Sequence, residues 1–141
     1  MIVLDQSEAV AEAVAALIPG CERGFGPCKA IGFLDGQGRF EAGVVYHNWS
    51  PESGVIELSA ASVHRSWLTR ERLRVVFGYP FDQLGGRIAV ARIGEHNARA
   101  RRIWRSLGAS EFPIPALRSP TEAEVIYTLA AETWRAGRFS R

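Results

Sequence analysis

The spacing of the apolar residues changes near residue 69, and this change limits the folds open to the chain. Residues 28–61 contain three short apolar runs separated by turn sequences, which is typical of antiparallel strands joined by tight connections. After Thr69 the apolar residues recur every three to four positions, as on a helix with one buried face. Strands followed by alternating helices and strands predict a mixed α+β fold.

The individual elements follow from the same periods and from capping and turn residues. The predicted order is a helix over residues 6–18, strands over 28–34, 40–49 and 55–61, a helix from Thr69 to Leu84, a strand over 87–93, a helix from Asn97 to Leu107, a strand over 124–130 and a final helical turn over 132–135. Pro80 predicts a break near Tyr79, and Pro113 and Pro115 indicate a loop. With no repeat or linker, residues 1–141 are expected to form a single domain.

Composition excludes several classes of protein. Apolar residues make up 47% of the chain and the net charge is only +2, so the protein is globular and its charge gives no argument for nucleic acid. No apolar run reaches the length of a membrane span, and residues 1–20 do not resemble a secretory signal, so we expect a cytoplasmic protein. The two cysteines, Cys21 and Cys28, cannot supply the four ligands of a zinc site, and no metal is predicted.

A family resemblance rests on three segments. The stretch from Asn97 to Gly108 resembles the helix of GNAT-family N-acetyltransferases that an Asn opens and a Leu-Gly pair closes. Residues 125–129, followed by Glu132-Thr133-Trp134, are similar to the ends of RimJ/RimL-type members. Residues 67–70 and 79–85 resemble small acetyltransferases encoded by phages and prophages. The resemblance covers roughly residues 28–135 and implies the GNAT fold.

In that fold the sheet is mostly antiparallel, and one parallel pair of strands splays apart between flanking helices. Here the pair would be strands 55–61 and 87–93, since a helix connects them. The resemblance implies that acetyl-CoA lies in the gap and that its acetyl group is moved to an amine. The acceptor, whether a small amine or an amine of a protein, is left open, and so is the oligomeric state, a homodimer included.

The resemblance also assigns the cofactor-binding residues. The pyrophosphate would lie on the backbone amides of Leu68, Thr69 and Arg70, at a helix start whose free N–H groups favour anions. Arg65 keeps the cation of the family's phosphate loop, and Asn97 would contact the cofactor arm. Leu68 and Arg70 stand where the family usually has glycines, which let the backbone approach phosphate closely.

Glu57 is the candidate general base, because it is the only carboxylate in the strand beside the expected gap. His47 and His64 are the alternatives. Trp104 occupies the position where many family members have a Tyr that protonates the departing thiolate, so Ser106 or water would have to replace that acid.

Two other functions remain open at this stage. A domain without the loop glycines and the Tyr could be a catalytically inactive GNAT domain that binds a partner. A second alternative is a phage protein that acts on nucleic acid, because one helix carries four arginines, Arg99, Arg101, Arg102 and Arg105. Their more ordinary explanation is a solvated helix face near the cofactor, so nucleic acid is not the expected partner.

Overall fold

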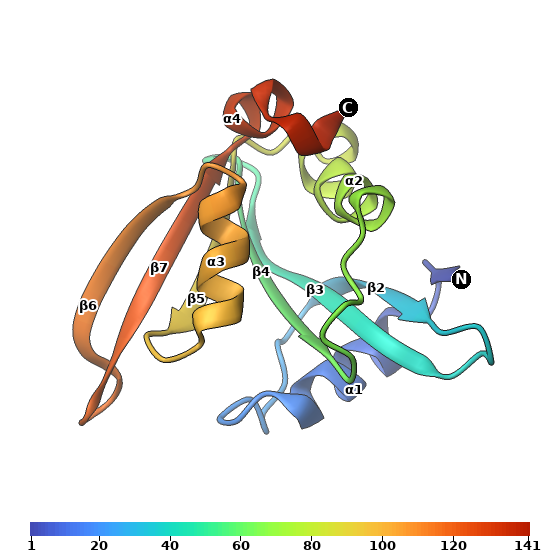
Figure 1. Ribbon diagram of the computed structural model, residues 1–141, viewed down its shortest axis with the longest axis horizontal. Coiled ribbons are helices and arrows are strands. Elements are labelled where there is room, and N and C mark those ends of the chain that lie inside the picture. The colour runs from blue at the N-terminus through green and yellow to red at the C-terminus, as the bar shows by residue number, and fades with distance from the viewer.

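Seven strands form one sheet in the computed structural model, which describes residues 1–141 (Figure 1). The elements are β1 (Ile2–Val3), α1 (Ser7–Leu17), β2 (Cys28–Leu34), β3 (Phe40–Ser50), β4 (Val55–Ser62), α2 (Arg70–Gly78), η1 (Tyr79–Gln83), β5 (Ile88–Gly94), α3 (Ala98–Ser106), β6 (Ser110–Ser119), β7 (Glu122–Ala130), α4 (Ala131–Ala136) and η2 (Arg138–Ser140). The sheet order is β1-β2-β3-β4-β5-β7-β6. The predicted α+β class is confirmed.

Only β4 and β5 pair in parallel, as the sequence predicted; every other neighbouring pair is antiparallel. Their pairing is short and runs from Val55↔Ile88 to Glu57↔Val90. Beyond that point β4 stays paired with β3 as far as Ser62, and β5 stays paired with β7 as far as Gly94. Each strand follows its antiparallel partner, so the two halves of the sheet separate (Figure 1).

The first half of the sheet is covered by α1 on one face. Val10 and Val14 of this helix are buried against Ala30 and Val45. The helix can approach closely because the strands beneath it carry Gly32 and Gly43. A Cβ at Gly43 would lie 2.7 Å from the Val14 side chain, too close for a real contact. The face of β5, β7 and β6 on the same side of the sheet has no helix over it (Figure 1).

The opposite face carries α2, α3 and α4 and the main core (Figure 1). Phe77 is the aromatic centre of this core. Its ring lies 5.6 Å from that of Trp104 in an edge-to-face arrangement and 4.9 Å from that of Trp134. Aromatic side chains from three helices therefore share one apolar layer against the sheet. None of the helices is both long and apolar enough to cross a bilayer.

Two predictions about proline have different outcomes. The break predicted at Pro80 is confirmed, because α2 gives way at Tyr79 to a five-residue π-helical turn. The loop predicted at Pro113 and Pro115 is wrong, since both lie in β6, the edge strand beside β7. An edge strand tolerates proline because a missing N–H that would face solvent costs no ladder hydrogen bond.

A polar network joins β6 to α3 and β7. The Tyr127 hydroxyl donates to Glu111 at 2.6 Å, and Arg101 and Arg105 donate to the same carboxylate. These hydrogen bonds lower the pKa of Glu111 to about 2. The bond from Tyr127 has the largest effect and the bond from Arg105 the next largest. The ionised carboxylate therefore fastens the outer hairpin to α3.

This network predicts a loss of stability in acid. The pKa of Glu111 is lower in the folded chain than its ordinary value of 4.5, so the stabilisation is complete above that pH and is lost as the pH falls towards about 2. The melting temperature of Glu111→Gln should therefore depend less on pH across this window than that of the wild type. Glu12→Gln, an exposed change on α1, is the control and should retain the wild-type slope. Equal slopes for Glu111→Gln and wild type would show that the network contributes nothing.

Candidate active site

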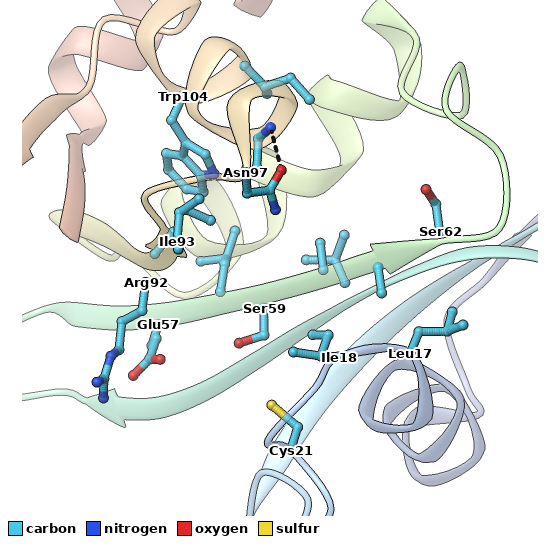
Figure 2. Close-up of a pocket in the computed structure, with 18 of the residues that line it drawn as sticks. Leu17, Ile18, Cys21, Glu57, Ser59, Ser62, Arg92, Ile93, Asn97 and Trp104 are labelled. Atoms are coloured by element: carbon cyan, nitrogen blue, oxygen red, sulfur yellow. Dashed lines mark hydrogen bonds between the residues drawn. The ribbon is translucent and has the colours of Figure 1, made fainter. Parts of the chain in front are cut away.

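A cavity of about 820 Å³ opens where β4 and β5 separate. Its walls come from both strands, from one side each of α2 and α3, and from the segment that follows α1. The cavity extends to both sides of the sheet. Asn97 and Trp104 line it on the side of α2 and α3, whereas Glu57, Ser59 and Cys21 line it on the side of α1 (Figure 2).

The strand period places Glu57 and Ser59 on the same face of β4. Both point into the cavity on the side of α1 (Figure 2). Their neighbours Ile56 and Leu58 are buried in the main core on the opposite face. The carboxylate thus lies on a strand that the core holds rigidly from behind.

Glu57 belongs to a cluster with residues of β3. His47 is its direct partner across the antiparallel pair, and the ring Nε2 lies 3.8 Å from Glu57 Oε2 and 2.9 Å from Ser59 Oγ. The Asn48 side-chain amide donates to Glu57 Oε1 at 3.0 Å and lies 3.3 Å from His47 Nδ1. One amide group therefore contacts both the carboxylate and the imidazole.

These contacts define the protonation of the histidine. Asn48 Nδ2 is a donor, so His47 Nδ1 accepts and the ring proton resides on Nε2, which donates to Ser59. Burial lowers the pKa of His47, and the nearby Glu57 carboxylate only partly opposes this effect. The imidazole is therefore neutral near pH 7, and the free Oε2 of Glu57 is the open proton acceptor of the cluster.

Asn48 adopts a backbone conformation that few residues accept, with φ at +52°. It lies at the irregularity in the β3–β4 pairing between His47 and Ser50, just before the turn. Asn is among the residues that tolerate this left-handed region best. The irregular backbone is what directs the amide back towards Glu57.

No protein-family model matches the sequence, and no curated protein matches it. Solved structures do match: a spermidine/spermine N-acetyltransferase from Vibrio cholerae, in complex with manganese ions, has a TM-score of 0.75 at 9% identity, over 95% of this chain and 94% of that chain. The fold is GNAT-like.

Two further structures share the GNAT-like fold. A candidate acetyltransferase from T. thermophilus has a TM-score of 0.67 at 18% identity, over 92% of this chain and 67% of that one. Another candidate acetyltransferase has a TM-score of 0.67 at 17% identity; the match covers 87% of this chain and 64% of that one, so this chain spans under two thirds of its length.

Within the GNAT-like fold, the five predicted cofactor residues do not all meet at the cavity. Leu68 and Asn97 line it. Thr69 does not; its hydroxyl accepts from the Arg72 amide and caps α2. The Arg70 guanidinium lies over the Phe139 ring at 5.8 Å from its centre, and Arg65 is exposed in the turn before α2.

The backbone amides at this helix start are nevertheless available. Those of Leu68, Thr69 and Arg70 have no hydrogen-bond partner within the chain. Arg72, in the first turn of α2, is a further cation close to these amides. Its guanidinium, however, pairs with Glu41 at 2.7 Å and donates to the Trp67 carbonyl.

The α3 helix of the GNAT-like fold is capped as predicted. The Asn97 side chain accepts from the Ala100 amide at 3.2 Å (Figure 2). The four arginines of this helix do not form one free basic face, because Arg101 and Arg105 are paired with Glu111. Only Arg99 and Arg102 lack an ion-pair partner, which removes much of the support for nucleic-acid binding.

The candidates for the general acid and the alternative base also have defined positions. Trp104 is largely buried and borders the cavity, where its indole supplies no acidic hydroxyl. The Ser106 hydroxyl donates to the Ile103 carbonyl at 2.7 Å and lies outside the cavity lining. His64 is exposed and does not line the cavity either.

Sequence reasoning did not identify three charged residues of the cavity wall, Arg92, Arg118 and Glu124. Glu124 is buried, and the two arginines pair with it from β5 and β6. The only signal in the sequence was a glutamate at the start of an apolar strand. Its partners could not be found from spacing, because one lies 32 residues away.

Proposed function

We propose that this chain is an acetyl-CoA-dependent N-acetyltransferase. The observation that supports the proposal best is the short parallel pairing of β4 and β5, which opens into a large cavity with a carboxylate on its wall. The match to solved acetyltransferases agrees with this function.

The groups around the cavity fit acetyl-CoA. Beyond Glu57 and Val90 the facing edges of β4 and β5 have no strand partner, so their backbone N–H and C=O groups are available to the amides of an extended ligand arm. The unpaired amides of residues 68–70 suit the pyrophosphate. Leu68 and Asn97 would contact the arm, while Arg65 and Arg70 would act on the phosphates through charge alone.

When bound, acetyl-CoA supplies an activated acetyl group as a thioester. The chain must supply a neutral amine, since an ammonium has no lone pair with which to attack. Glu57 can take the amine proton directly or through a water, because its Oε2 accepts no hydrogen bond in the chain and faces the cavity. Removal of this proton is the chemical role that we assign to Glu57.

His47 and Asn48 act through Glu57 rather than on the substrate. The Asn48 amide fixes the orientation of the Glu57 carboxylate by donating to Oε1. The imidazole of His47 is a polar group beside Oε2, and because it is neutral it leaves the negative charge of the carboxylate in place. Neither Trp104 nor Ser106 is placed to protonate the leaving thiolate, because Trp104 has no hydroxyl and the Ser106 hydroxyl is bonded elsewhere. Of the two acids that the sequence analysis named, Ser106 and water, only water can therefore reach the cavity.

Binding of acetyl-CoA tests the proposal. A ligand that binds only the folded chain stabilises it by about 2.7 kcal/mol at 100 times its Kd, so the melting temperature should rise by several degrees. Calorimetric titration supplies the Kd. Absence of both heat and a melting shift would reject the cofactor and with it the proposed function.

Two observations favour the alternative in which the chain is a binding module. Leu68 and Arg70 place side chains where glycines would expose the backbone, and Trp104 replaces the usual acid. A chain that binds acetyl-CoA but transfers no acetyl group to any amine would support that alternative.

A further inference from the structure

A buried carboxylate lies at the cavity wall between two arginines. The Glu124 side chain is only 3% exposed. Its Oε2 accepts from Nε and Nη2 of Arg92 at 3.0 and 2.7 Å, and its Oε1 accepts from Nη1 of Arg118 at 2.6 Å. Two cations therefore neutralise one anion, and the trio carries a net positive charge.

The arginines remain accessible although they are paired. Their side chains are 48% exposed for Arg92 and 30% exposed for Arg118, and both line the cavity. Nη1 of Arg92, and Nε and Nη2 of Arg118, donate to no group of the chain. The cavity wall thus presents unused guanidinium donors, and burial of Glu124 fixes both side chains in place.

This charge lies on the same side of the sheet as Glu57. Arg92 extends from β5 to the side on which Glu57 extends from β4 (Figure 2). Val90 is the partner of Glu57 across the parallel pair, so Arg92 is the next residue along β5 on that face. The pairing of β4 and β5 ends at Glu57 and Val90, so Arg92 faces Glu57 across the point where the two strands begin to separate.

We propose that the acceptor is a small amine that also carries a carboxylate close to its nitrogen, of which an amino acid is the simplest example. This inference rests on the proposed function. The carboxylate lies against Arg92 and Arg118, while the amine faces Glu57 and the thioester. The amine nitrogen forms the new bond to the acetyl carbon, the thiolate leaves, and Glu57 takes the amine proton.

The same wall disfavours polyamines. A polycation needs several carboxylates for its additional charges, whereas here Glu57 is the only carboxylate of the lining without an arginine partner. The lining contains three arginines, Arg92, Arg99 and Arg118, against Glu57 and Glu124. Spermidine is therefore expected to be a poor acceptor, although spermidine acetyltransferases share the fold.

The test compares matched acceptors: phenylalanine, phenylalaninamide, phenethylamine and spermidine. Release of the CoA thiol should show a kcat/KM for phenylalanine about 10–100-fold above that for the amide or the amine, the range expected for a charged hydrogen-bond pair. Equal values, or a preference for spermidine, would overturn the inference while leaving acetyl transfer established. Transfer to none of them would count against the proposed function instead.

A binding measurement distinguishes a failure of this inference from a failure of the proposed function. N-acetylphenylalanine should bind the chain in the presence of CoA more tightly than N-acetylphenylalaninamide, whether or not turnover is seen. Calorimetry that finds no difference would overturn the inference independently of catalysis.

Variants then assign the preference to the arginines. Arg92→Gln leaves Glu124 paired with Arg118, and it should raise the KM for phenylalanine by about 10–100-fold with little change for phenethylamine. Arg118→Lys keeps the charge and should retain part of the preference for the carboxylate. Arg102→Gln, exposed on α3 and outside the cavity, is the control. If Arg92→Gln lowers the melting temperature but leaves the preference intact, the arginines serve only to hold Glu124, and the inference is wrong.

Discussion

Replacing Glu57 with Gln should lower kcat by about 10²–10⁴-fold, the usual loss when a general base is removed, and should leave the Kd for acetyl-CoA nearly unchanged. The amide keeps the size of the side chain, and its oxygen can still accept from Asn48. What it loses is the charge that draws a proton from the amine.

Glu52→Gln is the matched control for this variant, because Glu52 is exposed in the turn before β4 and lies outside the cavity. It should turn over as the wild type does. Normal turnover by Glu57→Gln would remove the role from Glu57, and His47 would become the next candidate because it is the only histidine that lines the cavity.

Replacing Ala60 with Trp should raise the Kd for acetyl-CoA by at least about 100-fold, which corresponds to a loss of about 2.8 kcal/mol. Ala60 is exposed on β4, beyond the last residue paired with β5, and it lines the cavity. An indole at this position fills the space between the separating strands and covers their unpaired edges. The loss should therefore be in binding of the cofactor rather than in folding.

The control for added bulk is Ala9→Trp, because Ala9 is exposed on α1 and lies outside the cavity lining. Both variants should melt near the wild-type temperature without ligand, and only Ala60→Trp should lose the shift caused by acetyl-CoA. Tight binding by a folded Ala60→Trp would place the cofactor somewhere other than the gap between β4 and β5.

The parts of the fold that the sequence predicted are those with local causes. Thr69 and Asn97 cap their helices through their own side chains, and Pro80 interrupts its helix by lacking an N–H group. The parallel arrangement of β4 and β5 followed from the helix between them, because such a crossover joins parallel strands. None of these features requires knowledge of a distant residue.

The features that could not be predicted depend on contacts distant in the sequence. The prolines around Pro113 predict a loop when the sequence is considered alone. The segment is a strand because it pairs with β7 at the edge of the sheet, where proline is acceptable. Glu57 could be proposed as the base from its position in the strand. Its orientation, however, depends on Asn48, and no local sequence pattern predicts the positive φ of that residue. The role of Glu124 could not be predicted, because it depends on ion pairs with Arg92 and Arg118 from two other strands.

The most direct test of the account is acetyl transfer itself. The purified chain is incubated with acetyl-CoA and a mixture of amines that includes amino acids and spermidine, and the products are measured by mass spectrometry. We expect an N-acetylated amine in an amount equal to the CoA released. This product should be lost in Ala60→Trp and retained in Ala9→Trp. Acetyl-CoA that binds tightly yet remains intact in the presence of every amine would contradict the proposed function, and would identify the chain as a binding module.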